Sequence, residues 1–468
     1  MLSSLSSLMV PKAKKVKLYI KKLTAFNKSC KGLFQIDEFK SLTETEILFF
    51  CHDINRSYTY HGKKYSTIVD TLNELFIEQG ITSLTIARPY STIPTNTCFG
   101  NVCRVNGLIA RAYLFGYLQN LITKIFPGFK SKSIYQFQVD IWGVILNKTK
   151  PKVIIGIEPI KELCEAAKVR GICVIDLQHG ANMDASGTNA GHYYRMGYRE
   201  PEQKGWPDFT ACWDTSSCKL MREHRASYLK PILLGHPWVS RFLSVNAKKD
   251  DLIQELNIKY PLEKTKPVIL FSLQYTRDVD GNSNSFPPIP IQLDKFIRTE
   301  GDSYTWWIRI HPQLLRQPHR DRILKEINEM YGSYHNVNWT EVSYAPLPYV
   351  LEKTDLHFTR DSSVTKEAAM LGVKTGLFGI PGRHDEVEEL FSNEIKENYA
   401  KFLDVNDYEE IRAFIIRSIK VAHREKFDYG KQSMRIIEFV NVTSNAIQKG
   451  RSINTCMNEF SDKYMLGY

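Results

Sequence analysis

The sequence predicts an α/β protein with two Rossmann-like domains that face each other across a cleft. First, short apolar runs of strand length alternate with longer segments of helical periodicity, which is the pattern of parallel sheets. Second, polar residues directly follow several of these runs, as they do at the ligand-binding carboxyl ends of such sheets. Third, a chain of 468 residues is long enough for two domains, each with its own core.

These patterns divide the chain into four parts. Residues 1–36 form a basic arm, residues 37–245 a first Rossmann-like domain and residues 246–430 a second one. The stretch 246–266, rich in lysine and acids, is the expected connection between the domains. Residues 431–468 contain a helix and a tail, and we expect this helix to cross back to the first domain.

The composition is that of a globular protein, with 43% hydrophobic and 24% charged residues. A net charge of +11 favours an anionic membrane surface or anionic substrates as partners. We expect no nucleic-acid partner, because no nucleic-acid-binding motif is present. The nine cysteines are an odd number without CxxC spacing, which indicates reduced thiols in a cytoplasmic protein.

The N-terminal arm carries eight lysines and has no acid before Asp37. Its apolar residues recur at helical spacing, with lysines on the other face: Val16, Tyr19, Ile20 and Leu23. This pattern is typical of a helix that lies in an anionic membrane interface. We therefore expect residues 12–31 to hold the protein peripherally on the inner membrane, the alternative being a solvated basic arm with no partner.

The first domain begins with a buried strand at 47–50, followed by a polar loop, a helix at 68–76 and a strand at 81–87. The polar loop lies at the carboxyl end of the first strand, where open α/β sheets bind their ligands. Asp53 and Arg56 in this loop are therefore candidates for catalysis or ligand contact. The alternative is that both are ordinary turn residues.

Helices are expected at 107–127 and 134–146, and a βαβ unit follows over 153–180. Its first strand ends at Glu158 and its second at Gln178-His179-Gly180. Both ends lie on the same edge of the sheet, so Glu158 and His179 should approach one site. The alternatives are that Glu158 caps the next helix and that His179 is a structural imidazole. Strands at 209–214 and 231–237 close the domain, and His236-Pro237 is expected at the edge between the domains.

The second domain opens with a strand at 268–273 that contains Ser272. The loop 272–284 has acids but lacks the terminal glutamate of a calcium loop, so we predict no metal site. Apolar blocks at 306–312 and 349–358 read as strands, and the first ends in His311-Pro312. A helix opened by Ser362 and Ser363 and closed by Gly372 follows.

Strand, loop, strand and helix N-terminus in this order indicate an anion site. Arg309 and His311 can donate hydrogen bonds to phosphate oxygens, and the serine hydroxyls lie beside unpaired backbone N–H groups. The alternative is that the serines only cap the helix and that His-Pro only ends a strand.

A His-Pro motif followed by a Ser-Ser motif in the C-terminal half resembles the bacterial sialyltransferase and Kdo-transferase superfamily, and the resemblance covers roughly residues 150–380. Gln178-His179-Gly180 also resembles enzymes of surface-polysaccharide assembly. The resemblance implies a GT-B fold and a CMP-activated sugar. It places His311 with Ser362 and Ser363 on the nucleotide phosphate, and Glu341 on the ribose. The full expected nucleotide-binding set is Ser272, Arg309, His311, Pro312, Glu341, Ser362 and Ser363.

Glycosyl transfer needs a base or nucleophile, and donors for the departing phosphate. We expect Glu158, His179 and Asp53 to be the catalytic candidates. The loop between Asn182 and Trp206 is rich in aromatic and basic residues that suit sugar rings and acidic substituents. The expected acceptor-binding residues are Arg56, Gln178, Tyr194 and Arg195.

The predicted function is transfer of Kdo or a sialic-acid-like sugar from a CMP donor to capsule, O-antigen or lipooligosaccharide. The partners are then a nucleotide sugar and a glycan or lipid-linked glycan acceptor, with no cofactor and no metal. The same architecture also admits a UDP-sugar transferase, a CDP-glycerol phosphotransferase or a sugar-nucleotide epimerase. A non-catalytic glycan-binding subunit of a polysaccharide assembly complex is an alternative from another class.

Overall fold

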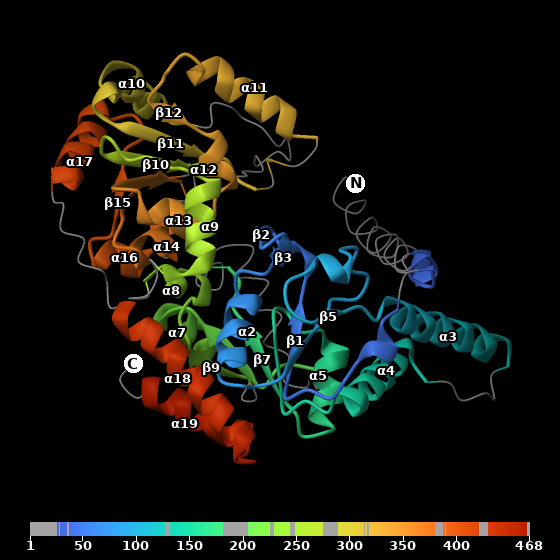
Figure 1. Ribbon diagram of the computed structural model, residues 1–468. Helices are drawn as coiled ribbons and strands as arrows, with labels where there is room; N and C mark the ends of the chain where they lie inside the picture. The colour runs from blue at the N-terminus through green and yellow to red at the C-terminus, as the bar shows by residue number, and fades with distance from the viewer. Residues whose placement is uncertain are drawn as a thin grey trace, which may run out of the picture.

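A computed structural model shows two parallel β-sheets with helices on both faces, joined by short helices and by a returning C-terminal helix (Figure 1). The structure describes the following residues: 26–27, 29–34, 37–126, 132–180, 205–224, 229–243, 249–274, 289–312, 314–315, 318–360, 362–379, 387–388, 390–420 and 429–465. The predicted α/β class with two Rossmann-like domains is confirmed.

The first sheet has seven parallel strands in the order β5-β4-β1-β6-β7-β8-β9. Numbered along the chain, this is the Rossmann order 3-2-1-4-5-6 with one strand added. The strands before β6 are added on one side of β1 and those from β6 onward on the other, so the topological switch point lies between β1 and β6. Its strands are β1 (Ile47–Cys51), β4 (Ser83–Ala87), β5 (Val102–Cys103), β6 (Val153–Gly156), β7 (Cys173–Leu177), β8 (Phe209–Cys212) and β9 (Lys230–Leu233).

Two layers of helices cover this sheet. On one face, α3 (Asn106–Ile125), α4 (Ile134–Thr149) and α5 (Lys161–Lys168) pack on side chains such as Leu48 and Phe50. On the other face, α2 (Val69–Glu78) packs on Phe49. All five residues of β1 are buried, as expected for a strand covered on both faces.

The second sheet has six parallel strands in the order β12-β11-β10-β13-β14-β15, again the Rossmann order. Its strands are β10 (Val268–Ser272), β11 (Thr305–Arg309), β12 (Val337–Asn338), β13 (Leu356–Thr359), β14 (Lys374–Phe378) and β15 (Ala400–Leu403). The helices between and after them are α10 (Ile291–Thr299), α11 (Arg320–Tyr331), α12 (Thr340–Tyr344), α13 (Leu347–Glu352), α14 (Val364–Met370), α16 (Ser392–Lys396) and α17 (Tyr408–Lys420).

One apolar core runs from the first sheet into the second domain. It includes Val153 of β6, Trp238 of α8 (Pro237–Leu243), Leu256 of α9 (Asp251–Lys259) and Tyr349 of α13. The two domains are therefore joined by buried side chains as well as by the connecting chain.

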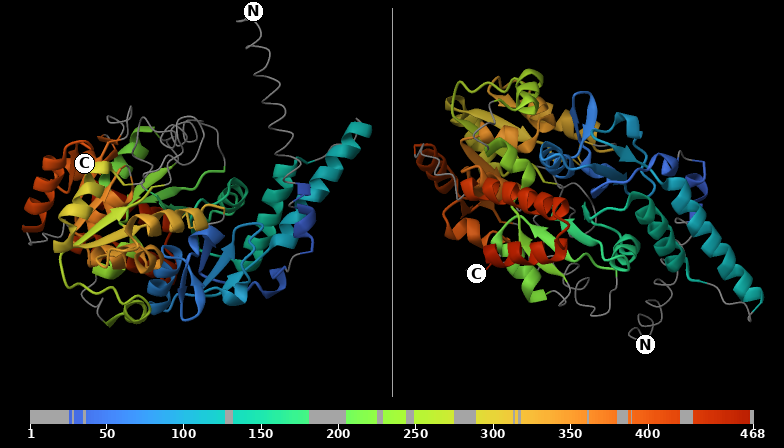
Figure 2. Two further views of the ribbon diagram at one scale, coloured as in Figure 1. Left: turned by 90° about the horizontal axis from the view of Figure 1, so that it is seen from above. Right: turned by 60° about the horizontal axis from the view of Figure 1, so that its bottom comes forward.

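The C-terminal helices return to the first domain, as the views in Figure 1 and Figure 2 show. In α18 (Tyr429–Gln448), the ring of Phe439 lies edge-on to Phe76 of α2, 6.3 Å away. In α19 (Ile453–Met465), the hydroxyl of Ser461 donates to the carbonyl of Pro231 in β9 at 2.8 Å. Both C-terminal helices therefore pack against elements of the first sheet's domain.

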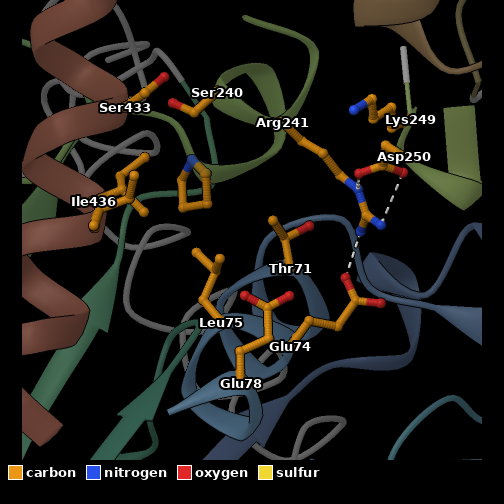
Figure 3. A pocket seen from close by; sticks show the side chains of 12 residues that line it. Thr71, Glu74, Leu75, Glu78, Ser240, Arg241, Lys249, Asp250, Ser433 and Ile436 are labelled. Atoms are coloured by element: carbon orange, nitrogen blue, oxygen red, sulfur yellow. Dashed lines mark hydrogen bonds and ion pairs between the residues drawn. The ribbon is translucent and has the colours of Figure 1, made fainter. Parts of the chain in front are cut away.

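A cavity of about 310 Å³ lies where α2, α8 and α18 meet (Figure 3). On its wall, Arg241 forms an ion pair with Asp250 at 2.6 Å and a second one with Glu74. None of the residues in the predicted catalytic or nucleotide-binding sets lines this cavity.

Two local predictions differ from the structure. The block 349–358, read as a strand, is the helix α13 followed by β13, because Pro346 and Pro348 start a helical turn whose apolar side chains are buried.

The polar loop after β1 contains a hairpin, β2 (Tyr58–Tyr60) and β3 (Lys63–Tyr65). His61 and Gly62 turn the chain there with positive φ of 47° and 71°, as two-residue hairpin turns require.

Candidate active site

The carboxyl ends of β6 and β7 bring Glu158 and His179 together at the switch point of the first sheet. Nε2 of His179 lies 3.5 Å from Oε1 of Glu158, and Arg88, which follows β4, donates to Oε2 of Glu158 at 3.2 Å. The side chain of Glu158 is 50% exposed and that of His179 is 29% exposed. The two residues predicted to share a site are therefore in contact and open to solvent.

The backbone of Glu158 is held in an uncommon conformation. Its φ of 47° lies in the left-handed region, which residues other than glycine rarely adopt. Its N–H donates to Oδ1 of Asp176 at 2.9 Å, and Asp176 is a buried residue of β7. Burial raises the pKa of Asp176 to about 7. Strained residues of this kind concentrate at functional sites, and Asp176 fixes where Glu158 points.

Two imidazoles at this edge have lowered pKa values. Burial lowers the pKa of His179, while Glu158 opposes the shift. His52, which follows β1, also has its pKa lowered, by burial and then by Arg88. Nδ1 of His52 accepts the N–H of Ile54 at 3.1 Å, so its neutral form carries the proton on Nε2. Both imidazoles are therefore neutral near pH 7 and can accept a proton.

Asp53 and Gln178 hold the loops around this edge. Asp53 accepts the hydroxyl of Ser91 at 2.5 Å and the N–H of Thr92 at 2.8 Å, which ties the ends of β1 and β4 together. Gln178 is 1% exposed, and its side chain accepts the N–H of Trp213 at 2.8 Å and donates to Ser217 at 3.2 Å. The geometry therefore gives both residues a positioning role, and their predicted roles toward substrate stay predictions.

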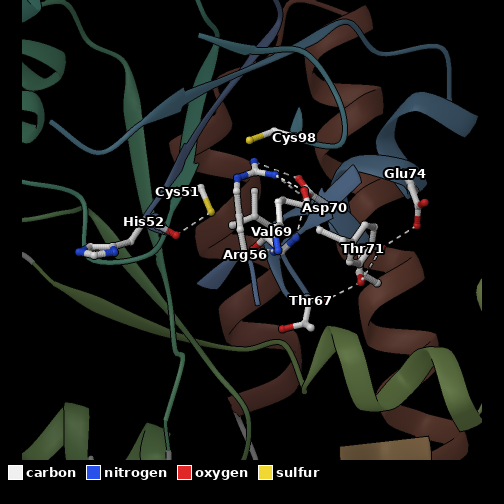
Figure 4. Close-up of polar contacts among 12 residues, drawn as sticks. Cys51, His52, Arg56, Thr67, Val69, Asp70, Thr71, Glu74 and Cys98 are labelled. Carbon is white, nitrogen blue, oxygen red and sulfur yellow. Dashed lines mark hydrogen bonds and ion pairs between the residues drawn. The ribbon is translucent and has the colours of Figure 1, made fainter. Parts of the chain in front are cut away.

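Arg56 is buried in the first domain, contrary to its predicted contact with an acceptor (Figure 4). Its guanidinium donates to both carboxylate oxygens of Asp70, at 2.8 and 3.4 Å, and to the carbonyl of Lys64 at 3.2 Å. Asp70 also accepts the N–H of Ser66 at 2.6 Å. A guanidinium with these partners and 4% exposure is structural, because a buried charge needs its counterion.

The predicted anion site lies at the carboxyl edge of the second sheet. His311 is partly buried and Pro312 is exposed, and both follow β11, while Ser362 and Ser363 follow β13. Since β11 and β13 flank β10, their ends are about 10 Å apart. The hydroxyl of Ser362 accepts the N–H of Val364 at 3.3 Å, and Ser363 at the N-cap makes no capping hydrogen bond.

Ser272 and Arg309 are held inside the second domain. The hydroxyl of Ser272, a residue 3% exposed, lies 3.0 Å from Nε2 of the buried His357. Arg309 donates to the carbonyls of Val342 and, at 2.7 Å, Ala345, so it fastens α12 to β11. This geometry gives both side chains partners within the domain, and their predicted contact with a nucleotide stays a prediction.

Glu341 lies in the first turn of α12, and its side chain is exposed. This places it on the same side of the second sheet as the end of β11, because α12 is fastened to that strand. Its predicted role at the ribose stays a prediction. Tyr194 and Arg195, the other predicted acceptor contacts, lie outside the described residues.

The two sheets meet at their carboxyl edges through ionisable pairs. His236, which follows β9, lies 3.8 Å from Oε1 of Glu367 in α14. Lys366, only 2% exposed, lies 3.5 Å from Oδ2 of Asp214, which follows β8. The predicted place of His236 at the edge between the domains is confirmed, whereas its partner Glu367 was not foreseen.

Burial controls the protonation of this interface. It lowers the pKa of His236 to about 3, and the ring of Trp213 covers the imidazole at 4.0 Å. Burial also raises the pKa of Glu367 to about 7, against the attraction of Arg309. Tyr58 of β2 lies near the same guanidinium, and burial raises its pKa. Near neutral pH the imidazole is therefore neutral and Glu367 is close to its titration midpoint.

Side chains that can bind metals and cysteine thiols also occur in the described ranges. Among those residues, no group of three or more His, Cys, Asp or Glu side chains is arranged to hold a metal ion. All nine cysteines are free thiols, and eight of them are buried.

Comparisons with known proteins give structural likeness only. No protein-family model matches the chain, and no curated protein is similar to it in sequence. The wall teichoic acid polymerase TagF has a TM-score of 0.49 and 14% identity, over 97% of this chain and 99% of that one. UDP-GlcNAc 2-epimerase from Neisseria meningitidis, bound to UDP-GlcNAc, has a TM-score of 0.49 and 14% identity. The match covers 84% of this chain and 98% of that one. MnaA from S. aureus with UDP has a TM-score of 0.49 and 12% identity, and the match covers 86% of this chain and 97% of that one.

Proposed function

We propose that this protein is a nucleotide-sugar-dependent glycosyltransferase. The donor that its motifs favour is a CMP-linked Kdo or sialic-acid-like sugar, and the acceptor is a bacterial capsule, O-antigen or lipooligosaccharide glycan. In this proposal the nucleotide lies at the carboxyl edge of the second sheet and the acceptor at that of the first. The reaction uses no resident metal ion or cofactor.

One observation carries the proposal: the carboxyl edges of two Rossmann-like sheets meet, and each edge presents the groups that one half of the reaction needs. The pairs His236–Glu367 and Lys366–Asp214 join the edges. The contact of Glu158 with His179 supplies a base on the first edge. Since ligands of open α/β sheets bind outside the carboxyl ends of the strands, a substrate placed there touches both domains.

The residues suggest how the transfer proceeds. Glu158 or the neutral His179 accepts the proton of the acceptor hydroxyl while its oxygen bonds to the anomeric carbon. The bond from that carbon to the phosphate oxygen breaks, and its electron pair leaves with the nucleotide. His311 and the hydroxyl of Ser363 are the donors that would stabilise the departing phosphate. In a retaining reaction Glu158 would instead act as the nucleophile.

We also propose that the acceptor is lipid-linked and is met at the cytoplasmic face of the inner membrane. Residues 12–31 contain eight lysines and no acid. Each lysine near an anionic bilayer contributes about 1 kcal/mol of attraction. Peripheral binding by this arm would bring the acceptor edge close to a membrane-bound glycan.

Calorimetric titration of the purified full chain with CMP, UDP, CDP and GDP tests the nucleotide site. We expect selective binding of CMP, and a Kd raised by about 10-fold to 100-fold in His311→Ala, because a charged hydrogen bond contributes about 1.5–3 kcal/mol. His335→Ala is the matched control, since this exposed histidine precedes β12 and lies at the opposite edge of the sheet.

Each other outcome of the titration points elsewhere. Preference for UDP would indicate a UDP-sugar transferase or a sugar-nucleotide epimerase, and preference for CDP a CDP-glycerol phosphotransferase. Binding without turnover of any donor would favour a non-catalytic subunit of a polysaccharide assembly complex. Absence of binding to all four nucleotides would refute the proposed function.

A further inference from the structure

The helix α3 carries an apolar stripe on its outer side. Four exposed side chains recur at intervals of three, three and four residues, which places them on one face of the helix. They are Phe115, Leu118, Leu121 and Ile125, with exposed fractions of 54, 53, 40 and 69%. Phe126, directly after the helix, is 63% exposed. Single exposed apolar side chains are ordinary, but a contiguous row on a projecting helix marks an interaction surface.

The neighbouring helix α4 packs beside this stripe and reaches its edge, where the ring of Phe115 lies 5.4 Å from that of Phe137. A Cβ added to Gly116 would lie 3.0 Å from the ring of Phe137 and 3.1 Å from Ile134, so the helices are in close contact at that glycine. Ala112, one turn earlier, is buried in the same contact face. Figure 1 and Figure 2 show the two helices projecting together from the first domain, with α3 outermost.

The end of the basic arm packs along α3. The ring of Phe26 lies 5.1 Å from that of Tyr117, and Ser29 shares a hydrogen bond of 2.6 Å with Tyr90. A Cβ added to Gly32 would lie 2.9 Å from Ala110. From Gly32 to Phe26 the contacts therefore move from Ala110 to Tyr117, toward the C-terminal end of α3. Lys21 and Lys22 precede Phe26 by five and four residues, so chain length alone keeps them within about 18 Å of it.

The net positive charge of the chain comes from two segments of its sequence, the basic arm and the segment that contains α3. Residues 1–36 and 104–139 contain 13 of the 62 Lys and Arg residues and none of the 51 acids. The other residues therefore carry 49 basic and 51 acidic side chains, a net charge of −2. Arg111 pairs with Asp37 at 3.7 Å and Lys132 with Asp140 at 2.8 Å, so the positive charge that would complement an anionic lipid surface is mainly that of residues 1–36.

We propose that the outer face of α3, defined by Phe115, Leu118, Leu121 and Ile125, inserts into the headgroup region of an anionic bilayer. The lysines of the basic arm would add electrostatic attraction to the same lipid surface. No helix among the described residues is long and apolar enough to span a membrane. The stripe therefore lies in the interface, where apolar contacts and cations act together. This inference deepens the membrane proposal for residues 12–31, yet it can fail independently of it.

The test is sedimentation of the full chain with phosphatidylcholine vesicles and with vesicles containing phosphatidylglycerol. Leu118→Glu/Ile125→Glu should lower partition into the anionic vesicles at least tenfold, because two carboxylates replace the inserting side chains. Val169→Glu/Ile258→Glu is the matched control: it adds the same charge at apolar positions that are 78 and 83% exposed, away from α3. Leu118→Ser/Ile125→Ser repeats the test without added charge.

An arm variant and a change of salt concentration distinguish the contribution of the arm to vesicle binding from that of the stripe. Lys14→Gln/Lys15→Gln/Lys17→Gln should remove the part of binding that 0.5 M NaCl also removes, whereas the stripe variants should remove the part that survives salt. If the stripe variants partition like wild type, the inference is refuted and the arm alone binds. If wild type ignores vesicles but forms a dimer that the stripe variants dissociate, the face binds a second copy, which also refutes it.

Discussion

The buried pair of Arg56 and Asp70 gives a quantitative test of the structure, because the sequence alone placed Arg56 at the acceptor. The two side chains are 3 and 0% exposed. Arg56→Ala removes both guanidinium donors of Asp70 and leaves the N–H of Ser66 as its remaining partner here. Breaking a buried pair on one side costs about 3–5 kcal/mol, so we expect a loss of that size at pH 7.5.

The loss should depend on pH in a defined direction. Burial raises the pKa of Asp70 to about 6 even with Arg56 beside it, so the carboxyl is mostly ionised at pH 7.5 and mostly protonated at pH 5. Removing the cation therefore costs more at pH 7.5 than at pH 5. The double variant Arg56→Ala/Asp70→Ala leaves no charge unpaired, and its stability should equal or exceed that of Arg56→Ala instead of showing a summed loss.

Urea unfolding followed by circular dichroism measures these free energies, with turnover per folded molecule as a second readout. Arg111→Ala is the control, since this side chain is 66% exposed and its ion pair with Asp37 spans 3.7 Å. We expect that control to cost under about 1 kcal/mol. Unchanged stability of Arg56→Ala together with a raised KM for acceptor would refute the structural role and restore the predicted contact.

Two further predictions concern the domain interface and the first sheet. Burial raises the pKa of Glu367 from 4.5 to about 7, so the native state binds this proton more tightly and the protein loses stability as pH rises through that window. Glu367→Gln should flatten the fall of the urea midpoint between pH 5 and 8, and parallel curves for both proteins would contradict it. Gly156→Ala places a Cβ 2.7 Å from Cβ of Phe50, so we expect a loss of roughly 1–3 kcal/mol in urea unfolding. Gly180→Ala meets nothing within 4 Å and should change stability little; equal losses for both would argue against the packing of β1 on β6.

Much of the fold was predictable because buried parallel strands are apolar runs of nearly constant length. The expected strand at 47–50 is β1, and the βαβ unit over 153–180 is β6, α5 and β7. The prediction failed at 349–358, where a short apolar run carries no period that separates strand from buried helix. The hairpin β2–β3 was missed because its turn, His61-Gly62, lacks the usual Asn-Gly signal.

The contacts of the candidate site were predictable only where position along a strand decides which side chains meet. Glu158 and His179 were found because both follow strands that end on one edge. Which polar side chains turn inward depends on distant partners that a single sequence does not reveal. Ser272 pairs with His357, 85 residues away, and Gln178 pairs with Trp213, 35 residues away. Glu367 was missed for the same reason, because the packing of the domains brings it to His236.

The central claim is that the edge with Glu158 and His179 catalyses glycosyl transfer, and donor turnover by Glu158→Gln tests it most directly. Release of nucleotide would be measured from CMP-Kdo, CMP-sialic acid, UDP-GlcNAc and CDP-glycerol. Glu329→Gln in α11 of the second domain is the control, because this carboxylate is 62% exposed. The account predicts that Glu158→Gln keeps its nucleotide Kd within about 2-fold while turnover falls by about 10²-fold or more, the contribution expected of a positioned base. Wild-type turnover by Glu158→Gln, with the nucleotide still bound, would contradict it.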